Sequence, residues 1–388
     1  MRVAFTLIGG KHWTGGHNYL VNLLRALSQH QADRLTPVLF VSEDCGDLSA
    51  FAELRGVEIV RTSLLNESRR TFNLVKCALL GRDEELSSLL HAHHIDLIFE
   101  NAQFTGWRLD LPVIAWMPDF QHRDLPHMFP LFARLKREIG FRVQVMSGRF
   151  IMLSSDDARH ACERYYPETR GRTRTIHFAV PPGPKTSQAE ARRIADSYGL
   201  PERFFFMPNQ FWKHKNHALV VEALAILKKR GQRVVVAASG KQCDPRDPEH
   251  FPRLQALVDR LGVQEEMRFL GMIPYPHLTA LMRTCAALLN PSLYEGWSTT
   301  VEEARALGTP MLLSDLDVHR EQMSGEATYF DRHSPHSLAD ALQNFQTMDA
   351  AEREDRALAA RRDAEQRVLR FSAEFADLAE VVCLPQSH

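Results

Sequence analysis

The sequence predicts an α/β protein built from two doubly wound domains, each a parallel sheet covered by helices on both faces. Three observations lead to this prediction. The chain has 388 residues, and ordinary domains hold roughly 150 residues each, so two domains are expected. Short apolar runs alternate with amphipathic stretches along the chain, which is typical of parallel sheets. Two segments in different halves each combine a first strand, a loop and a helix.

The first of these segments begins with residues 3–8, an apolar run that predicts a buried strand. A glycine-bearing loop follows, and then apolar residues at helical spacing: Tyr19, Leu20, Leu23, Leu24 and Leu27. The second begins with residues 203–207 and continues through the polar loop 208–216 into a helix with Leu219, Val220, Leu224 and Leu227. Further strands are expected at 38–41, 96–99, 113–117 and 151–154, then at 234–238, 267–270, 286–290 and 311–314.

The best linker candidate is Pro181-Pro182-Gly183-Pro184, because neither a helix nor an inner strand tolerates this run. We therefore expect a first domain at 1–183, a linker at 184–200 and a second domain at 201–370. Residues 371–388 are expected to form a C-terminal helix that packs back on the first domain. Ligands of such sheets bind beyond the carboxyl ends of the strands, so two facing domains enclose a cleft.

The composition excludes several classes of protein. The chain is 44% hydrophobic and 24% charged, with a formal net charge of -1, so no global field attracts nucleic acid. Its six cysteines are scattered without CxxC spacing, which disfavours a zinc site or a redox motif. We expect no secretory signal, because the apolar run near the start is short, and we find no stretch of about 20 apolar residues. We expect a cytoplasmic protein, with at most a peripheral contact at the membrane face.

The segment 286–304 carries the strongest chemical signal. A predicted strand ends at Asn290, and a helix is expected to open near Ser298. Small hydroxyl residues at a helix start leave backbone N–H groups pointing outward, with the positive end of the helix dipole behind them. Such an end suits a diphosphate. Glu295 and Glu303 flank it, and carboxylates accept hydrogen bonds from sugar hydroxyls. The alternative is that Ser298 merely caps the helix and both glutamates are solvated.

Glu295 and Glu303 are separated by seven residues within PSLYEGWSTTVEEARALGTPMLLSD, and this segment resembles the donor-binding motif of glycosyltransferase family 4. The resemblance covers nearly the whole chain, through Gly15-Gly16, Lys215-Asn216 and residues 269–271. It implies a retaining enzyme of the GT-B fold, with two Rossmann-like domains. It also implies a nucleoside-diphosphate sugar as donor and no required cofactor.

Roles carried over from the family are implied for individual residues. Glu295 would contact the donor sugar or its phosphate, and Glu303 would hold the ribose hydroxyls. Lys215 would neutralise the charge that grows on the leaving diphosphate, which a fixed cation stabilises in the transition state. The pyrophosphate would bind the backbone amides of the intervening segment: Gly296, Trp297, Ser298, Thr299 and Thr300. Asp315 and Asp317 follow a strand, but helix capping accounts for them better than a metal.

The chain departs from the family at two places. Where the family usually has Gly-Arg ahead of the lysine, this sequence has Asn209-Gln210. Gln210 donates a hydrogen bond but carries no charge, so Lys213 is a candidate to compensate, and His214 or His217 would add charge at lower pH. The family's usual histidine after the strand at 113–117 is Pro118 here.

Candidates in the first domain are Gly15, Gly16, Asn18, Asp119 and His122. The glycines, ahead of a helix expected to begin near Asn18, would let the backbone approach a phosphate or sugar, or would form only a tight turn. Asp119 is expected to orient a substrate hydroxyl, and capping of its loop is the alternative. His122 is a candidate to replace the missing histidine on the acceptor side.

The segment 131–149 carries five cations against Glu138 alone: Arg134, Lys136, Arg137, Arg142 and Arg149. With Phe132 and Phe141 interleaved, it is a candidate surface for anionic lipid or a lipid-diphosphate acceptor. A solvated helix face is the alternative.

These observations together predict a glycosyltransferase that moves a sugar from a nucleoside diphosphate to a hydroxyl of a glycan or lipid-linked glycan, in cell-surface polysaccharide or lipopolysaccharide synthesis. Two alternatives stay open. One is a sugar-nucleotide epimerase or a phosphorylase of the same fold. The other is a non-catalytic partner subunit that binds nucleotide sugar or glycan, which the departures at Gln210 and Pro118 favour.

Overall fold

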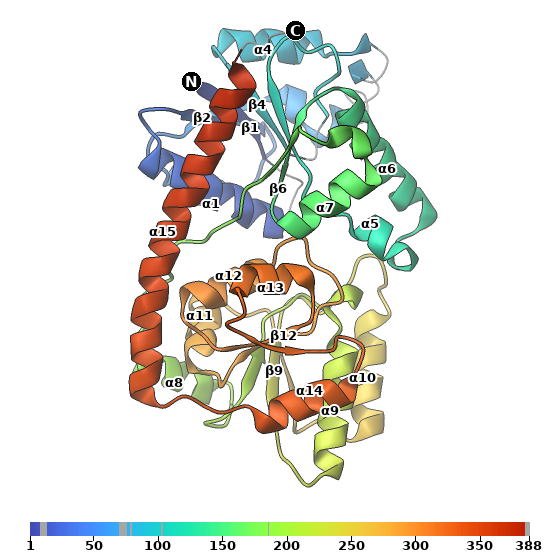
Figure 1. Cartoon of the computed structure of the whole chain (residues 1–388), viewed down its shortest axis with the longest axis vertical. Helices are drawn as coiled ribbons and strands as arrows, with labels where there is room; N and C mark the ends of the chain where they lie inside the picture. Colours follow the sequence, from blue (N-terminus) through green and yellow to red (C-terminus); the bar gives the residue numbers. More distant parts are fainter. Residues whose placement is uncertain (8–13, 70–75, 78–79, 102–103, 185, 385–388) are drawn as a thin grey trace. The chain divides into compact units, whose positions relative to one another are not determined.

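A computed structural model describes residues 1–7, 14–69, 76–77, 80–101, 104–184 and 186–384. The described chain divides into two compact units, which Figure 1 draws in one view. Unit 1 consists of Met1–Phe120, Leu131–Ala179 and Gln366–His388, and unit 2 of Gln121–Pro130 and Val180–Glu365. Each unit is described by itself.

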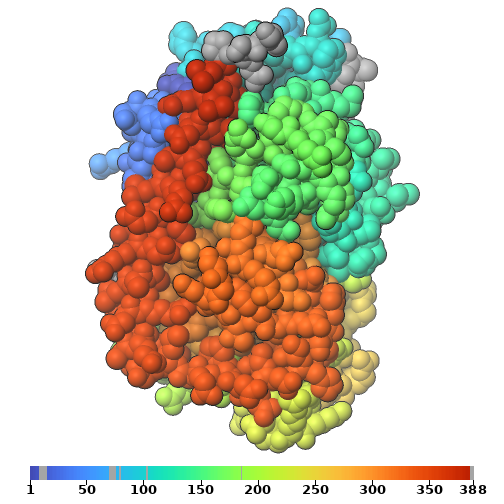
Figure 2. Space-filling model, in the orientation of Figure 1, coloured from blue at the N-terminus to red at the C-terminus, as the bar shows by residue number. Residues whose placement is uncertain are grey.

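The described part of unit 1 contains a seven-stranded parallel sheet in the order β3-β2-β1-β4-β5-β6-β7. Its strands are β1 (Arg2–Thr6), β2 (Thr36–Ser42), β3 (Glu58–Thr62), β4 (Leu97–Asn101), β5 (Val113–Trp116), β6 (Phe150–Leu153) and β7 (Thr173–Thr175). Its helices include α1 (Thr14–His30), α2 (Ser49–Ala52), η1 (Ser63–Leu65), α4 (Glu84–Ala92), α6 (Leu131–Met146), α7 (Asp156–Tyr165) and η3 (Pro167–Thr169). Figure 2 shows α6, in teal to green, on the outer surface of this unit.

Unit 2 contains a six-stranded parallel sheet within the described residues, in the order β10-β9-β8-β11-β12-β13. Its strands are β8 (Phe205–Met207), β9 (Val236–Ser239), β10 (Met267–Gly271), β11 (Leu288–Asn290), β12 (Met311–Ser314) and β13 (Thr328–Phe330). Its helices include α5 (Gln121–Asp124), η2 (Pro126–Met128), α8 (Gln188–Ser197), η4 (Lys213–Lys215), α9 (His217–Lys229), α10 (His250–Leu261), α11 (Tyr275–Thr284), α12 (Thr299–Ala306), α13 (Asp317–Met323) and α14 (Pro335–Asn344).

Helix α15 (Ala350–Cys383) contributes residues up to Glu365 to unit 2 and later residues to unit 1. In unit 1 its Phe375 ring lies 5.8 Å from Phe5 and 5.5 Å from Phe99, so this end of the helix is part of the core of the sheet. Residues 385–388 of the predicted C-terminal helix lie outside the described residues.

The predicted linker at 184–200 contains α8. The hydroxyl of Tyr198, directly after this helix, forms a hydrogen bond of 2.7 Å with Nδ1 of His277 in α11. Because Ala191, Ala195 and Leu200 are buried, most of this segment belongs to the packed body of unit 2. Lys185 lies outside the described residues.

In each unit the strand order reverses beside the first strand, between β1 and β4 and between β8 and β11. Phe5 pairs with both Leu39 and Phe99, and Leu288 of β11 pairs with Phe206 of β8. A reversal leaves a crevice beyond the carboxyl ends of its two strands, because their connections leave on opposite faces. The doubly wound α/β prediction is therefore confirmed. Among the described residues, no helix is long and apolar enough to cross a membrane.

Candidate functional site

The candidate site of unit 2 is built on the loops that follow β8 and β11. The loop after β8 carries η4, which ends at Lys215, and the loop after β11 carries Glu295 and leads into α12. Since β8 and β11 are neighbours at the reversal of strand order, their carboxyl ends bring these two loops together. Lys215 and Glu295 lie 80 positions apart in the sequence.

Lys215 and Glu295 form an ion pair in which Nζ lies 2.6 Å from Oε1. The side chains are only 13% and 8% exposed. An ammonium group and a carboxylate in so little water attract one another strongly, and each would be costly to leave alone. Lys215 and Glu295, which the sequence analysis named as candidates in separate segments, thus form one ion pair.

The backbone at Asn216 fixes the position of Lys215. Asn216 has φ 59°, in the left-handed region that asparagine tolerates better than most residues. Its Nδ2 donates hydrogen bonds to the carbonyls of Pro291, at 3.1 Å, and Arg332, at 3.0 Å. These bonds tie the end of η4 to the loop before Glu295, so the cation is held from both sides.

Glu295 lies in a network of buried polar groups. The Ser292 hydroxyl lies 2.7 Å from Glu295 Oε1 and 2.6 Å from Asn290 Oδ1. Burial opposes ionisation of Glu295, but the charge of Lys215, the nearby His319 and the hydrogen bonds hold its pKa below the usual value. The carboxylate is therefore ionised and oriented before any ligand arrives.

Helix α12 begins with Ser298 as its N-cap, whose side chain accepts a hydrogen bond from the Val301 amide. Asn290 Nδ2 donates to the same hydroxyl at 3.0 Å. Capping is thus one role of Ser298, since a capped first turn keeps the helix end rigid. The next two amides, of Thr299 and Thr300, donate to no acceptor within the described residues, as expected at the first turn of a helix.

The Ser298 amide corrects one expectation. It donates to Gln322 Oε1 of α13 at 3.2 Å, and Gln322 Nε2 donates back to the Ser298 carbonyl at 3.1 Å. This amide is therefore occupied by protein and is not part of an anion-binding end. Gly296 and Trp297, the other two expected amide donors, lie half-buried in the loop ahead of it.

Glu303 lies half-buried on α12, in the turn after the helix start. Burial raises its pKa to about 7, and a hydrogen bond from Tyr275 only partly opposes that rise. A carboxyl with this pKa changes its charge near neutrality, which is unusual for glutamate. Groups with such strong shifts gather at functional sites.

Two histidines of η4 and α9 contradict the expectation that they add charge at lower pH. His214 and His217 are buried, which keeps the pKa of His214 well below its usual value and lowers that of His217 to about 3. Neither ring supplies charge in mildly acidic solution. Gln210 accepts a hydrogen bond from the Lys241 amide at 2.9 Å, so it holds the loop after β9. The Lys213 side chain is exposed.

The aspartates after β12 do not cap α13. Its N-cap is Leu316, without a side-chain hydrogen bond. Asp317 is the first helical residue, and Asp315 pairs with Arg332 at 3.1 Å. This pair also faces the loop that Asn216 holds, since Asn216 binds the Arg332 carbonyl. The expected capping is therefore wrong, and the structure assigns Asp315 to an ion pair.

Several residues of the network gave no signal of their own in the sequence. Ser292 and Gln322 are fully buried, and so is His319, whose Nδ1 lies 3.0 Å from the Ser314 carbonyl. Ser292 lies inside the motif and is traceable to it. Gln322 and His319 become neighbours of the loop only through the packing of α13, so no spacing rule finds them.

The first-domain candidates lie in unit 1, apart from His122. Helix α1 begins at Thr14, so Gly15 and Gly16 lie in its first turn and do not precede it, and Asn18 lies one turn in. The expected start near Asn18 is wrong because a glycine is tolerated in a first turn, where backbone N–H groups lack helical partners anyway. His122 lies on α5 of unit 2 and is buried.

Asp119 follows β5 and forms an ion pair of 2.7 Å with Arg137 of α6. The two side chains are about equally exposed, at 26% and 27%, so water screens the pair in part. Asp119 is thus oriented by a cation, which suits a group that positions a hydroxyl.

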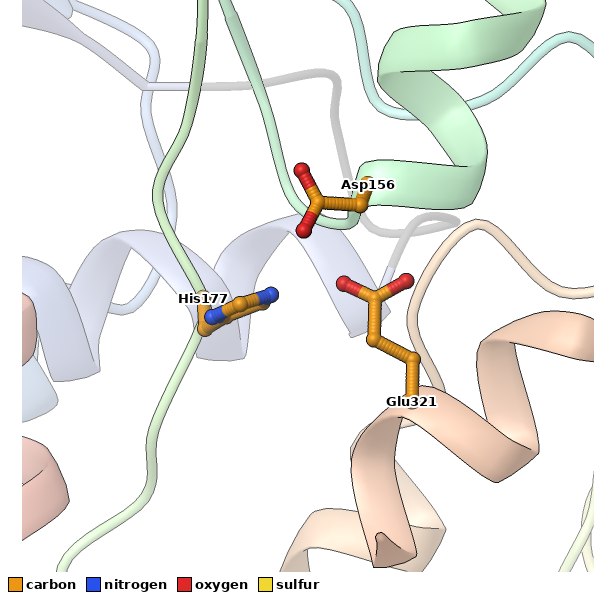
Figure 3. Close-up of side chains that lie close together, drawn as sticks. All are labelled: Asp156, His177 and Glu321. Atoms are coloured by element: carbon orange, nitrogen blue, oxygen red, sulfur yellow. The ribbon is translucent and has the colours of Figure 1, made fainter.

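A second polar cluster lies at the carboxyl end of the same sheet. Figure 3 shows Asp156 at the start of α7 and His177 on the segment after β7; its third side chain, Glu321, belongs to α13 of unit 2. Asp156 accepts hydrogen bonds from Thr175 Oγ1 at 2.8 Å and Arg159 Nε at 3.1 Å. Burial alone would raise the pKa of Asp156, but these bonds hold it below its usual value. They join the start of α7 to β7.

Comparison with known proteins gives the class. Residues 190–363 match the protein family described as "Glycosyl transferases group 1". This range includes Lys215, Glu295 and Glu303, so the candidate site lies inside the part of the chain that is similar to this family. The donor half of the sequence resemblance is therefore supported at the level of this group.

Individual relatives extend the comparison. The O-antigen chain mannosyltransferase RfbU of Salmonella typhimurium is 25% identical over 150 residues, 39% of this chain and 40% of RfbU. The chain spans less than half the length of the curated relatives it matches. A glycosyltransferase from Rickettsia africae has a TM-score of 0.71 and 14% identity, over 100% of this chain and 98% of its own. The Anabaena protein HepE, crystallised with UDP and glucose, has a TM-score of 0.71 and 16% identity, over 98% of this chain and 99% of its own. Likeness over whole chains makes the fold GT-B, as predicted.

Proposed function

We propose that this protein is a retaining glycosyltransferase of family 4 that moves a sugar from a nucleoside-diphosphate sugar to a hydroxyl of a glycan or lipid-linked glycan. The observation that carries the proposal is the buried Lys215–Glu295 pair beside the start of α12, inside a group 1 glycosyltransferase domain. HepE with UDP and glucose supports a nucleotide-sugar donor. RfbU, an O-antigen chain mannosyltransferase, supports an acceptor in polysaccharide synthesis.

In this proposal the nucleotide lies against the carboxyl ends of β8 and β11. The amides of Thr299 and Thr300, with the α12 dipole behind them, bind the diphosphate. Glu303 accepts hydrogen bonds from the ribose hydroxyls. Lys213 and Gln210 line the side of the nucleotide that lies away from Glu303. Glu295 contacts the sugar or the phosphate next to it. Gly15, Gly16 and Asn18 are assigned to unit 1's share of the ligand contacts, and Asp119 and His122 to the acceptor side.

Lys215 has the central chemical role. As the bond between the sugar's anomeric carbon and the diphosphate breaks, negative charge grows on the leaving oxygen. An ammonium group already fixed by Glu295 stabilises that charge without reorganising, because the pair is preorganised and shielded from water. The free amides of α12 act on the same oxygens.

Retention follows in this proposal from attack on the same face that the diphosphate leaves. The leaving phosphate oxygen takes the proton of the acceptor hydroxyl while the new C–O bond forms, so no separate protein base is needed. Asp119, held by Arg137, orients the acceptor hydroxyl. The protein acts in the cytoplasm, with a peripheral contact at the membrane face.

A donor panel followed by product analysis tests the proposal. Thermal shifts with GDP-, UDP-, ADP- and dTDP-sugars identify the donor, since a ligand of the native state raises the melting temperature. Turnover with that donor and an acceptor is then followed by NMR of the product's anomeric proton. A retained anomer, with diphosphate released only when acceptor is present, supports transfer. An inverted anomer contradicts retention, and acceptor-independent release favours epimerisation.

A further inference from the structure

Helix α6 presents an apolar stripe to solvent. Its five large apolar side chains are between 53 and 80% exposed: Leu131, Phe132, Leu135, Ile139 and Met146. On a helix with 3.6 residues per turn these positions fall on one face. Most large apolar side chains of the chain are buried, so this stripe is a local exception. Figures 1 and 2 show α6 on the outside of unit 1.

The opposite face of α6 anchors the helix to unit 1. Gln144 and Val145 are buried, and Val145 belongs to the apolar cluster around Phe120 and Cys162. Phe141 packs edge-on against Phe120 with ring centroids 5.6 Å apart. The helix therefore does not need the exposed stripe for its own fold, and its orientation is fixed.

The charged residues at the edges of the stripe indicate which kind of surface it can bind. Arg134 and Lys136 form no ion pair among the described residues, so their charge is available to a ligand. The single acidic residue of the helix, Glu138, accepts from the Tyr166 hydroxyl at 3.0 Å and faces Arg142 at 3.4 Å, so its charge is directed toward the protein. Arg149 is also removed from the surface, because it forms a buried pair of 2.6 Å with Glu100.

We propose that the exposed face of α6 binds the surface of an anionic lipid bilayer, with the stripe inserted among the acyl chains near the head groups. A row of five exposed apolar side chains, bordered by the cations Arg134 and Lys136, complements such a surface in polarity and charge. The contact itself does not depend on the chemistry of the site. Its purpose, to bring unit 1 to a lipid-linked acceptor, rests on the proposed function.

Vesicle sedimentation without donor or acceptor tests the contact, so failure of the proposed transferase activity leaves this result unaffected. The full chain is mixed with vesicles of phosphatidylcholine alone or with about a third phosphatidylglycerol. We expect binding to the anionic vesicles, at least about tenfold weaker binding after Phe132→Ser with Leu135→Ser, and loss of the anionic preference after Arg134→Glu with Lys136→Glu. Met272→Ser with Leu358→Ser is the matched control, because those side chains are 68 and 51% exposed in unit 2.

Unchanged melting temperatures for the three variants show that folding is intact. Binding by wild type that survives Phe132→Ser with Leu135→Ser overturns the proposal, as does no binding to either vesicle. Sedimentation of the wild type as a dimer, with this variant monomeric, also overturns it and assigns the stripe to contacts between copies of the chain.

Discussion

The ammonium of Lys215 lies 2.6 Å from the carboxylate of Glu295, across two loops that meet only where the strand order of unit 2 reverses. The charge of Lys215 helps to keep the carboxylate of Glu295 ionised although that side chain is buried. Because Glu295 holds its partner rather than acting alone, a change in either residue alters both stability and the proposed chemistry.

Replacing Lys215 with methionine separates those two effects. Lys215→Met leaves the buried Glu295 unpaired, so we expect the free energy of unfolding to fall by about 3 kcal/mol. We expect kcat to fall by about 100-fold or more, because no fixed cation remains at the leaving group. Denaturant unfolding and steady-state kinetics measure the two.

The double variant Lys215→Met with Glu295→Gln removes the unpaired charge. It should recover much of the stability but not the activity, which a double-mutant cycle detects. Lys228→Met is the matched control, since Lys228 pairs with Glu266 at 3.3 Å but is 49% exposed. Equal losses of kcat in Lys228→Met and Lys215→Met would remove Lys215 from the proposed site.

Glu303 predicts a pH dependence of nucleotide binding. Its pKa of about 7 means that the carboxyl is largely protonated at pH 6 and ionised at pH 8. Only the ionised form accepts from both ribose hydroxyls, so affinity for the nucleoside diphosphate should be about tenfold weaker at pH 6 than at pH 8. Calorimetric titration at several pH values measures this.

Glu303→Gln should bind the nucleotide weakly with a flatter pH profile, whereas Glu222→Gln, at an exposed position of α9, should keep the wild-type profile. An unaltered slope in Glu303→Gln would assign the titration to another group. The free energy of unfolding of the unliganded protein depends on pH in the opposite direction. Because the pKa of folded Glu303 lies above the 4.5 of a free glutamate, its contribution is full below 4.5 and is lost as pH rises through 7.

The free amides of α12 are testable by one substitution. Proline is tolerated at the first position of a helix, where Thr299 lies, and Ser298 has the extended backbone that a following proline requires. Thr299→Pro should therefore change the free energy of unfolding by less than about 1 kcal/mol while deleting one N–H group. A hydrogen bond to a charged group contributes about 1.5–3 kcal/mol, so nucleotide affinity should fall at least about tenfold.

Thr299→Ser retains the N–H and should bind like the wild type in the same titration. Full affinity in Thr299→Pro would mean that the diphosphate does not lie at this helix end.

Asn216 predicts that backbone conformation and hydrogen bonding contribute separately to the site. Asn216→Gly keeps the left-handed conformation but loses the bonds to Pro291 and Arg332, whereas Asn216→Ala loses both advantages. We expect Asn216→Ala to be less stable than Asn216→Gly by about 1 kcal/mol. Both should lower kcat, because Lys215 is no longer held from both sides. Thermal unfolding measures the difference in stability, and steady-state kinetics measure kcat. Equal stability of the two variants would contradict the prediction.

Much of the fold was predictable from local pattern. The apolar runs at 38–41, 113–117 and 151–154 correspond to β2, β5 and β6, because a strand buried on both faces needs an unbroken apolar run. The start of α1 was missed because Gly15-Gly16 was taken as a break, although glycine is tolerated in a first turn. Helix α8 was missed because the linker was extended beyond Pro184 over the residues that form it.

The sequence by itself determined the doubly wound α/β class and the residues around Glu295 and Glu303, because strand periodicity and one dense motif are local properties of the chain. Only the tertiary structure decided which groups are paired or neutral. The Ser298 amide is taken by Gln322, and His214 and His217 are buried and uncharged. Such outcomes depend on burial and on partners brought from distant loops, and pairing across 80 residues leaves no trace in local pattern.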